Sequence, residues 1–386
     1  RMSTLNVDAI VSSSGGNTAT INGQTLNADT IVGGRRNIIQ NGKFQVDRRH
    51  GFASHTVSSG SDFFADRWGF YTNSGAFTEY NATSEVVNDG PDGFDKSMKW
   101  TTTSVTGSGV PATGEVIFRQ PVEGYNIAHV NYGSANARDL ILSFYVKSSI
   151  AGNYGFTAQY TDSGGTNRYI QRSYTVSAAN TWERVTVTIP KNTANVMQQK
   201  TTGAGLRLNW DLGEGSTYSS AASTSWTSTY TNGLAGGVKI AEVNGATWQI
   251  TGVQLEVGNV VTPFEHLSYA EELAICQRYF QKITTDAGFD YGALSVAVGT
   301  SSRYYMPFPL KTEMRVDPTL SFSNVGHFRI TLQHSSSDAC TALQINYNHN
   351  ERPMLGCTAG SNNTGAVRMF GFNGNASAYI ALDAEI

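Results

Sequence analysis

Apolar and polar side chains alternate with a period of two along most of the chain, which is the pattern of half-buried β-strands. The clearest cases are residues 140–147 (LILSFYVK) and 185–189 (VTVTI), where an apolar side chain occupies every second position. Similar phrases recur between residues 37 and 262, and no helical period separates them. The predicted strands span residues 44–46, 68–71, 116–119, 140–147, 154–160, 169–176, 182–189, 206–210, 238–243 and 248–257. Strands repeated in this way predict a two-sheet sandwich or jelly roll.

Residues 248–283 are predicted to lead from this β body, through one helix, to a second β module. In the strand 248–257 the alternation slips by one position at Gly252, which indicates a β-bulge. Pro263 lacks an amide proton and therefore ends strand pairing. After the helix the β pattern resumes, with predicted strands at residues 291–298, 303–307, 319–323, 328–333, 341–347, 366–372 and 379–386.

The linking helix has a clear start signal. Ser268 followed by Glu271 forms a capping box, in which each side chain accepts a hydrogen bond from an otherwise unpaired amide. We expect a helix of about a dozen residues that begins near Tyr269. Its apolar residues fall three or four positions apart and predict a stripe that packs on a β surface: Tyr269, Leu273, Cys276 and Phe280.

The predicted fold is therefore all-β. It consists of a jelly-roll β-sandwich at residues 37–262, a short linking helix at 263–285 and a smaller C-terminal β module at 286–386. Residues 1–36 contain two β-like phrases, 5–10 and 18–23, which hold too little apolar surface to fold alone. Such an arm either packs against another subunit or another protein or is a flexible tail, and the sequence leaves both interpretations open.

Composition and charge narrow the function. The 386 residues carry a net charge of −3, and clustered Lys and Arg are scarce, so we expect no nucleic-acid partner. No apolar run approaches ~18 residues, so we expect neither an export signal nor membrane insertion, and the protein is expected to be made in a cytoplasm. The three cysteines form no CxxC pair, which favours neither a disulfide framework nor a zinc site, and Cys276 is expected to be a small core residue.

The best candidate for ligand binding is the long polar stretch 211–237 (DLGEGSTYSSAASTSWTSTYTNGLAGG). Loops of this length inside compact domains are usually functional or disordered. Tyr218, Trp226 and Tyr230 could stack on the C–H faces of sugars, while Asp211 accepts hydrogen bonds from hydroxyl groups. The alternative is that these rings pin the loop onto its own sandwich or onto a neighbouring subunit.

Catalysis is not expected. A glycosidase needs two carboxylates across a cleft, and Asp211 with Glu214, or Asp89 with Asp92, could form such a pair. Carboxylates of this kind ordinarily serve turns. The chain contains no GxSxG, HExxH or phosphate-loop motif, and its seven histidines are scattered, so neither an enzyme nor a metal site is predicted.

Trp68 and Trp248 lie in strand phrases and are expected in the core.

Five phrases, in this order, resemble a family of bacteriophage virion proteins, the tail-fibre or appendage proteins. They are residues 37–44 (NIIQNGKF), 65–70 (ADRWGF), 251–258 (TGVQLEVG), 262–266 (TPFEH) and 268–280 (SYAEELAICQRYF). Residues 313–319 are similar to the C-terminal modules of such proteins, and residues 2–7 to the short amino-terminal arms of marine phage fibres. The chain departs from the family pattern at residues 46–49, where an aromatic side chain is expected.

The resemblance implies a virion appendage with a carbohydrate-binding-like jelly roll, a homotrimeric assembly and virion localisation after synthesis in the host cytoplasm. Jelly rolls of this kind often carry a structural calcium. Three functions follow as hypotheses. The first is a tail fibre or similar appendage that adsorbs to host surface polysaccharide without catalysis, attached to other virion proteins by residues 1–36. The second is an assembly component without a glycan ligand, such as a head fibre, decoration or adaptor protein, and the third is a depolymerising tailspike.

Overall fold

The computed structural model describes residues 18–21, 24–27, 35–57, 59–73, 80–107, 109–284, 293–297, 302–331, 337–360 and 367–386. In the predicted arm, β1 (Thr18–Ile21) and β2 (Gln24–Asn27) pair as an antiparallel hairpin. The phrase at residues 5–10 lies outside the described residues, and the strand predicted at 291–298 lies partly outside them.

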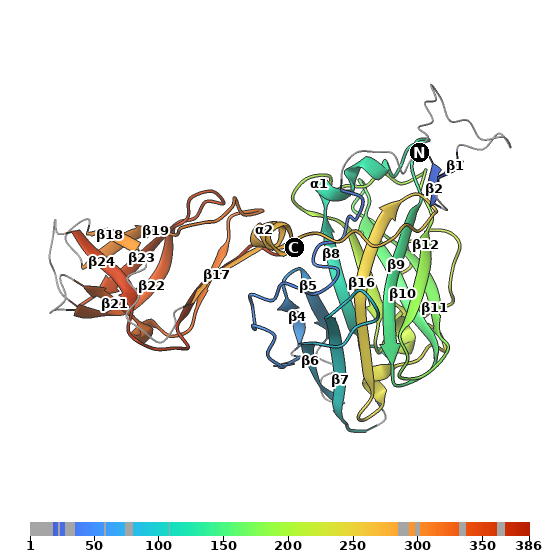
Figure 1. Cartoon of the computed structure of the whole chain (residues 1–386), viewed down its shortest axis with the longest axis horizontal. Helices are drawn as coiled ribbons and strands as arrows, with labels where there is room; N and C mark the ends of the chain where they lie inside the picture. The colour runs from blue at the N-terminus through green and yellow to red at the C-terminus, as the bar shows by residue number, and fades with distance from the viewer. Residues whose placement is uncertain are drawn as a thin grey trace, which may run out of the picture.

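Two six-stranded antiparallel sheets pack face to face as a sandwich (Figure 1), which confirms the predicted fold class. The first sheet has the order β11 (Asn167–Val176), β10 (Gly152–Thr161), β13 (Ala204–Asp211), β8 (Val116–Glu123), β5 (Trp68–Thr72) and β4 (Gly60–Ala65). The second sheet has the order β12 (Glu183–Ile189), β9 (Leu140–Ser148), β16 (Thr247–Val257), β7 (Ser97–Val105), β6 (Tyr80–Val87) and β3 (His55–Thr56).

Aromatic side chains fill the space between the sheets. Phe118 lies at the centre: its ring stacks on Trp68 at 5.0 Å between centroids, and its centroid lies 5.7 Å from Trp210 and 5.5 Å from Trp248. All three tryptophans are fully buried, as is Trp100. Contacts at these offset and tilted angles stabilise a core beyond simple burial. The predicted core positions of Trp68 and Trp248 are confirmed.

Some strand predictions are wrong. Residues 44–46 form a buried irregular segment in which Phe44 has a φ of 55°, and residues 238–243 contain the 3₁₀ turn η4 (Ile240–Glu242). Conversely, the strand β7 was not predicted because its run of three threonines, Thr101 to Thr103, hides the alternation. Thr102 is buried there, and its hydroxyl accepts a hydrogen bond from Trp100 Nε1 and donates one to the Ile240 carbonyl. The predicted bulge in β16 is confirmed, since the register shifts between Thr251 and Gln254.

The helix α2 (Tyr269–Gln277) begins where the sequence predicts. Glu271 N donates to Ser268 Oγ and Ser268 N donates to the Glu271 carboxylate, so the capping box is confirmed. The predicted apolar stripe is only partly right: Cys276 and Phe280 are buried, but Tyr269 is 53% exposed and the polar residue Glu272 is buried as well. The buried face is instead set by a polar contact, because Asn41 N donates to the Glu272 carboxylate at 2.5 Å.

The C-terminal module combines a small sheet and a barrel, and Figure 1 shows it projecting from the side of the sandwich at α2. The sheet has the order β17 (Phe280–Thr284), β25 (Tyr379–Asp383) and β20 (Thr319–Phe322). The closed barrel has the order β18 (Ala293–Ala297), β19 (Arg303–Pro307), β23 (Met354–Ala359), β22 (Ser337–Tyr347), β21 (Phe328–Thr331) and β24 (Val367–Phe372). The strand β25 is thus paired on both sides within its own chain.

Cysteine pairing differs from the sequence expectation. Cys340 on β22 and Cys357 on the neighbouring strand β23 form a disulfide, which the cysteine spacing did not favour. The third cysteine, Cys276, is free and fully buried, as predicted. One of the three cysteines is therefore an unpaired core residue near α2. The other two can pair only because the register of β22 and β23 brings them together.

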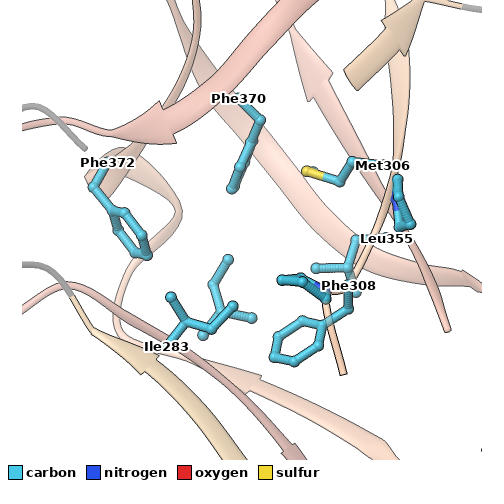
Figure 2. A pocket seen from close by; sticks show the side chains of 9 residues that line it. Ile283, Met306, Phe308, Leu355, Phe370 and Phe372 are labelled. Carbon is cyan, nitrogen blue, oxygen red and sulfur yellow. The ribbon is translucent and has the colours of Figure 1, made fainter. Parts of the chain in front are cut away.

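A small apolar pocket lies where the sheet meets the barrel (Figure 2), with a volume of about 30 Å³. Its labelled lining residues are Ile283, Met306, Phe308, Leu355, Phe370 and Phe372. A space of this size holds little more than one water-sized group. The buried apolar residues of the module form a core cluster of their own, separate from that of the sandwich.

A buried polar cluster, here called the junction cluster, joins the two bodies. It centres on Arg67, whose side chain is fully buried. Arg67 Nε donates to Gln40 Oε1 at 2.6 Å, Nη2 donates to the Pro121 carbonyl at 2.6 Å, and Nη1 forms an ion pair with Glu385. Its guanidinium carbon lies 3.5 Å from the ring centroid of Tyr279. Gln40 and Pro121 belong to the sandwich body, whereas Tyr279 follows α2 and Glu385 follows β25.

Further charged contacts surround this centre. Glu123 at the end of β8 accepts hydrogen bonds from Tyr279 Oη at 2.5 Å and from Arg278 Nη2 at 2.7 Å. Arg49 pairs with Asp383 at 2.7 Å and with Glu385 at 3.3 Å. Charges from both bodies are therefore paired across the boundary.

Asp66, next to Arg67 in sequence, is a buried carboxyl in this region. Its Oδ2 accepts a hydrogen bond from Arg48 N at 2.6 Å, whereas Oδ1 has no hydrogen-bond partner in the described part of the chain. Burial raises the pKa of Asp66 to about 7, against the opposing effect of Arg49. Neutral pH therefore lies inside its titration range.

We expect the substitution Glu385→Ala to loosen the C-terminal module from the sandwich. Removing one partner of a buried ion pair leaves an uncompensated charge on Arg67, which costs about 3–5 kcal/mol. The free energy of unfolding, measured by chemical denaturation, should fall accordingly, and proteolysis near α2 should accelerate. The control is Glu351→Ala, which removes an exposed carboxylate of the same module. Equal stability of the two variants would contradict the role of Glu385.

Asp66 should make stability depend on pH. Its pKa is about 7 in the folded protein against a usual value of 3.8, so between these values the folded state holds one proton more than the unfolded state. The free energy of unfolding should therefore fall as pH rises from 4 to 7, by at most about 4 kcal/mol from this group. Asp66→Asn cannot ionise and should show a shallower decline when thermal unfolding is followed against pH. The exposed-turn variant Asp92→Asn should retain the wild-type slope.

Candidate functional site

The predicted loop lies against the outer face of the first sheet. After β13 it forms the 3₁₀ turn η3 (Ser216–Tyr218) and two short strands that pair in parallel, β14 (Ser219–Ser220) and β15 (Gly233–Leu234). Tyr169 on β11 and Thr227 exchange backbone hydrogen bonds of 2.8 and 2.9 Å. The sheet residues beneath the loop are polar yet buried, namely Thr157, Gln171 and Asn209. The loop is therefore an ordered cover rather than a free excursion.

Asp211 ties the two ends of this cover together. Its Oδ1 accepts a hydrogen bond from Glu214 N at 2.9 Å, and its Oδ2 accepts one from Leu234 N at 3.0 Å. The residue is 1% exposed, and burial raises its pKa to about 6. Both carboxylate oxygens thus serve the loop, and the structure places Asp211 under the surface on which the sequence analysis expected it.

Trp226 packs on the sandwich. Its Nε1 donates to the Pro190 carbonyl at 2.8 Å, and its ring lies 5.0 Å from Tyr160 and 5.7 Å from Tyr132. It is one of the partly buried residues that extend the main core. For this ring, the structure agrees with the alternative interpretation, in which an aromatic side chain pins the loop onto its own sandwich.

Tyr218 and Tyr230 are brought together. Their rings meet edge to face at 5.0 Å, and Tyr230 also meets Tyr169 at 5.3 Å. Tyr230 Oη donates to Glu115 Oε2 at 2.5 Å and accepts from Asn232 Nδ2 at 2.9 Å. Tyr230 nevertheless keeps 38% of its surface exposed. The result is a pair of rings held in one orientation at the surface.

Sequence reasoning missed the neighbours of this ring pair on the first sheet. Glu115, just before β8, is 5% exposed, and burial raises its pKa. Arg119 on β8 and Tyr71 on β5 follow on the same outer face, with the guanidinium carbon 5.0 Å from the Tyr71 ring centroid. A single charged or aromatic residue in an alternating strand does not indicate which residues of other strands lie beside it. That depends on the order of the strands in the sheet.

The two carboxylate pairs considered for catalysis are engaged otherwise. Glu214, like Asp211, is buried, and burial together with Asp211 and Glu115 raises its pKa well above the usual range, against weaker effects of the Val116 amide and Lys239. Among the residues that the structure describes, neither Glu214 oxygen has a hydrogen-bond partner. A carboxyl in such a place is kept neutral, since a buried charge without a partner is costly.

In the other pair, Asp89 forms an ion pair with Lys147 and accepts a hydrogen bond from Trp182 Nε1 at 3.3 Å, while Asp92 is exposed in a turn. The absence of catalysis stays a prediction.

Within the described ranges, no group of three or more His, Cys, Asp or Glu side chains is arranged to hold a metal ion. In the same part of the chain, no helix is both long and apolar enough to cross a membrane.

Comparison with known proteins gives the following. No family model matches the sequence, and no curated protein matches it. Among solved structures, the chain is similar to the enzymatically active domain of tailspike protein 4 of bacteriophage CBA120, with 12% identity and a TM-score of 0.32 over 57% of this chain and 21% of that one.

Two similar structures are binding modules. A CBM4 module has 12% identity and a TM-score of 0.29 over 57% of this chain and 99% of its own. The CBM22-1 xylan-binding domain of Paenibacillus barcinonensis Xyn10C has 13% identity and a TM-score of 0.27 over 54% and 96%. All these TM-scores are low, so the similarities carry no weight for the function of this chain.

We expect Asp211→Ala to release the loop from the sheet. Two buried amides, those of Glu214 and Leu234, would lose their acceptor, at about 1–3 kcal/mol each. Limited proteolysis should then cut within residues 219–232 faster than in the wild type, and the free energy of unfolding should fall. Asp92→Ala, at an exposed turn, serves as the control. Unchanged protease resistance of Asp211→Ala would show that other contacts hold the loop.

Proposed function

We propose that this protein is a structural appendage protein of a bacteriophage virion, a tail fibre or similar, which adsorbs to host surface glycans without catalysis. The observation that carries the proposal is the Tyr218–Tyr230 pair, held edge to face and partly exposed on the outer side of the sandwich. Sugar rings present C–H faces that pack on aromatic rings, while their hydroxyl groups bond to nearby polar atoms.

The way the ring pair is held supports binding. Tyr230 is fixed by Glu115 and Asn232, and the loop that carries it is tied down by Asp211. A ring that is already ordered loses little conformational entropy when a ligand binds, which raises affinity for a given contact area. Tyrosine is well suited to this use because it offers a large amphipathic surface with two rotatable bonds.

The virion assignment rests on the resemblance of the five sequence phrases. Their residues meet at the junction between the sandwich and the C-terminal module. Gln40 contacts Arg67, Glu265 accepts hydrogen bonds from the amides of Arg36 and Asn37, and Asn37 Nδ2 donates to the Val253 carbonyl. The residues of these phrases thus pack against one another. This supports the interpretation that the phrases mark a protein in which a sandwich and a second β module are joined at this place.

Homotrimerisation and attachment to other virion proteins through residues 1–36 belong to the same proposal. Three copies of a weak site on one fibre raise avidity by roughly 10²–10⁴ without any new contact. Weak binding at each ring pair would therefore suffice for adsorption. An assembly component without a glycan ligand and a depolymerising tailspike are the competing functions.

The test compares wild type, Tyr218→Ala and Tyr347→Ala on a panel of bacterial surface polysaccharides. Tyr347 lies on the C-terminal module and is 66% exposed. Its substitution is the matched control, because it removes an exposed tyrosine away from the proposed site. Tyr218→Ala should weaken binding at least tenfold, and Tyr347→Ala should leave it unchanged. The mass in solution is measured first by light scattering, and a mass near 41.6 kDa would contradict the trimer.

Two outcomes favour the competing functions. Absence of binding to every polysaccharide by the intact oligomer would favour the assembly component. Release of reducing ends from a bound polysaccharide would favour the tailspike.

A further inference from the structure

Two arginines lie side by side on the exposed part of the face that carries the tyrosine pair. On β8, Arg119 stands opposite Asn209 of β13, and Arg207 lies two residues before Asn209 on the same side of the sheet. Diagonal neighbours of this kind have Cα atoms about 7–8 Å apart, well within reach of two arginine side chains. Both are partly exposed, in contrast to the buried Asn209 between them.

Neither arginine forms an ion pair with an acidic residue in the described part of the chain. Among the residues that the structure describes, no carboxylate oxygen comes within 4.0 Å of either guanidinium group. Arg119 Nη2 donates to Ser61 Oγ at 2.8 Å, and the guanidinium of Arg207 makes no hydrogen bond to any described residue. Each guanidinium has five N–H donors, so most of them are left for another partner.

The nearest acid does not fill this role. Glu115 attracts Arg119, but its carboxylate is bonded to Tyr230 Oη. Burial and the charge of Arg207 lower the pKa of Arg119 to about 10, and burial also lowers the pKa of Arg207. The two cations therefore repel each other in a partly desolvated place, and an anion between them would relieve that repulsion.

Several other cations of the sandwich have acidic partners. Lys99 pairs with Glu85, Lys147 with Asp89, and Arg168 with Asp162. The chain as a whole is negative, with a net charge of −3. The arginine pair is thus a local feature and no part of a general basic surface.

Aromatic rings flank the pair. The guanidinium carbon of Arg119 lies 5.0 Å from the Tyr71 ring centroid, and Tyr230 is close enough to Arg119 to raise the pKa of that guanidinium. A uronic acid carries its carboxylate directly on the sugar ring. A uronate packed on Tyr230 would therefore place its carboxylate next to Arg119, where the guanidinium fork matches its two oxygens.

We propose that the glycan recognised at this face is acidic, with a uronate carboxylate bound between Arg119 and Arg207 and its sugar ring on Tyr230. This inference rests on the proposed function and adds the chemical class of the ligand. Sulfate and phosphate groups share the negative charge, so the experiment must separate them from carboxylates.

The experiment measures binding to polygalacturonate, alginate and hyaluronate, to the same polymers after carboxyl reduction to neutral sugars, and to dextran, mannan and dextran sulfate. The proteins are wild type, Arg119→Gln/Arg207→Gln, Arg207→Gln alone and Arg184→Gln. Arg184 is exposed on β12 of the opposite sheet and gives a matched loss of one arginine. The Arg207 side chain makes no hydrogen bond to the described residues, so we expect the Arg207→Gln variant to keep the wild-type fold. Thermal unfolding of the variant checks this.

At least one uronate polymer should bind the wild type and lose about 10- to 100-fold in affinity on carboxyl reduction, the range expected for charge-assisted hydrogen bonds. The double variant should lose as much, Arg207→Gln alone should weaken binding measurably, and Arg184→Gln should bind like the wild type. Binding that depends on Tyr218 but is confined to dextran, mannan or the reduced polymers would overturn the acidic ligand and leave the proposed function standing. Binding confined to dextran sulfate would overturn the carboxylate. No binding to any polymer would overturn both proposals.

Discussion

The ion pair between Arg67 and Glu385 is the contact on which the arrangement of the two bodies depends. Arg67 is fully buried, and a guanidinium without partners in such a place would cost several kcal/mol. The sandwich satisfies part of it through Gln40 and the Pro121 carbonyl, but the charge itself is balanced from the C-terminal side. The planar fork of arginine is suited to this task because its donors point in fixed directions. Each body is therefore incomplete at this place without the other.

This dependence explains why so many distinctive phrases of the sequence lie far apart and yet serve one purpose. The residues around Asn37, Arg67, Val253 and Tyr279 form a single packing unit. At Gly42 the chain passes so close to the bulge of β16 that a Cβ atom would lie 2.2 Å from the Val253 carbonyl oxygen. The helix α2 contributes a buried glutamate to the same unit. The distinctive phrases of the sequence thus mark the junction between the two bodies. The proposed ligand face is a different part of the molecule, on the outer side of the first sheet.

Buried carboxyl groups are the second theme of the sandwich. Asp66, Asp211 and Glu214 have pKa values raised by burial, and each lies near other acids. Such groups often mark active sites, but here Asp211 bonds to loop amides and Glu214 is enclosed beneath the loop. The burial of Asp211 and Glu214 follows from the loop that covers the first sheet, whereas Asp66 is buried near the junction with the C-terminal module. The tyrosine pair and the two arginines remain partly exposed on that face, and they form the surface to which we assign the proposed ligand.

The sequence by itself determined what depends on near neighbours in the chain. Alternation at period two predicted the all-β class and most strands, the slip at Gly252 predicted the bulge, and Ser268 with Glu271 predicted the start of α2. These features arise from the backbone geometry of a few consecutive residues, so they are visible in a linear pattern. The long loop was also recognised, with its two tyrosines.

Tertiary structure alone decided which residues meet. The disulfide, the polar buried face of α2, the burial of Asp211 and the separation of Trp226 from Tyr230 all depend on strand order and register. The same holds for Arg119 and Arg207, which come from strands far apart in sequence and become diagonal neighbours because β8 pairs with β13. Long-range pairing brings such residues together, and no local periodicity records it.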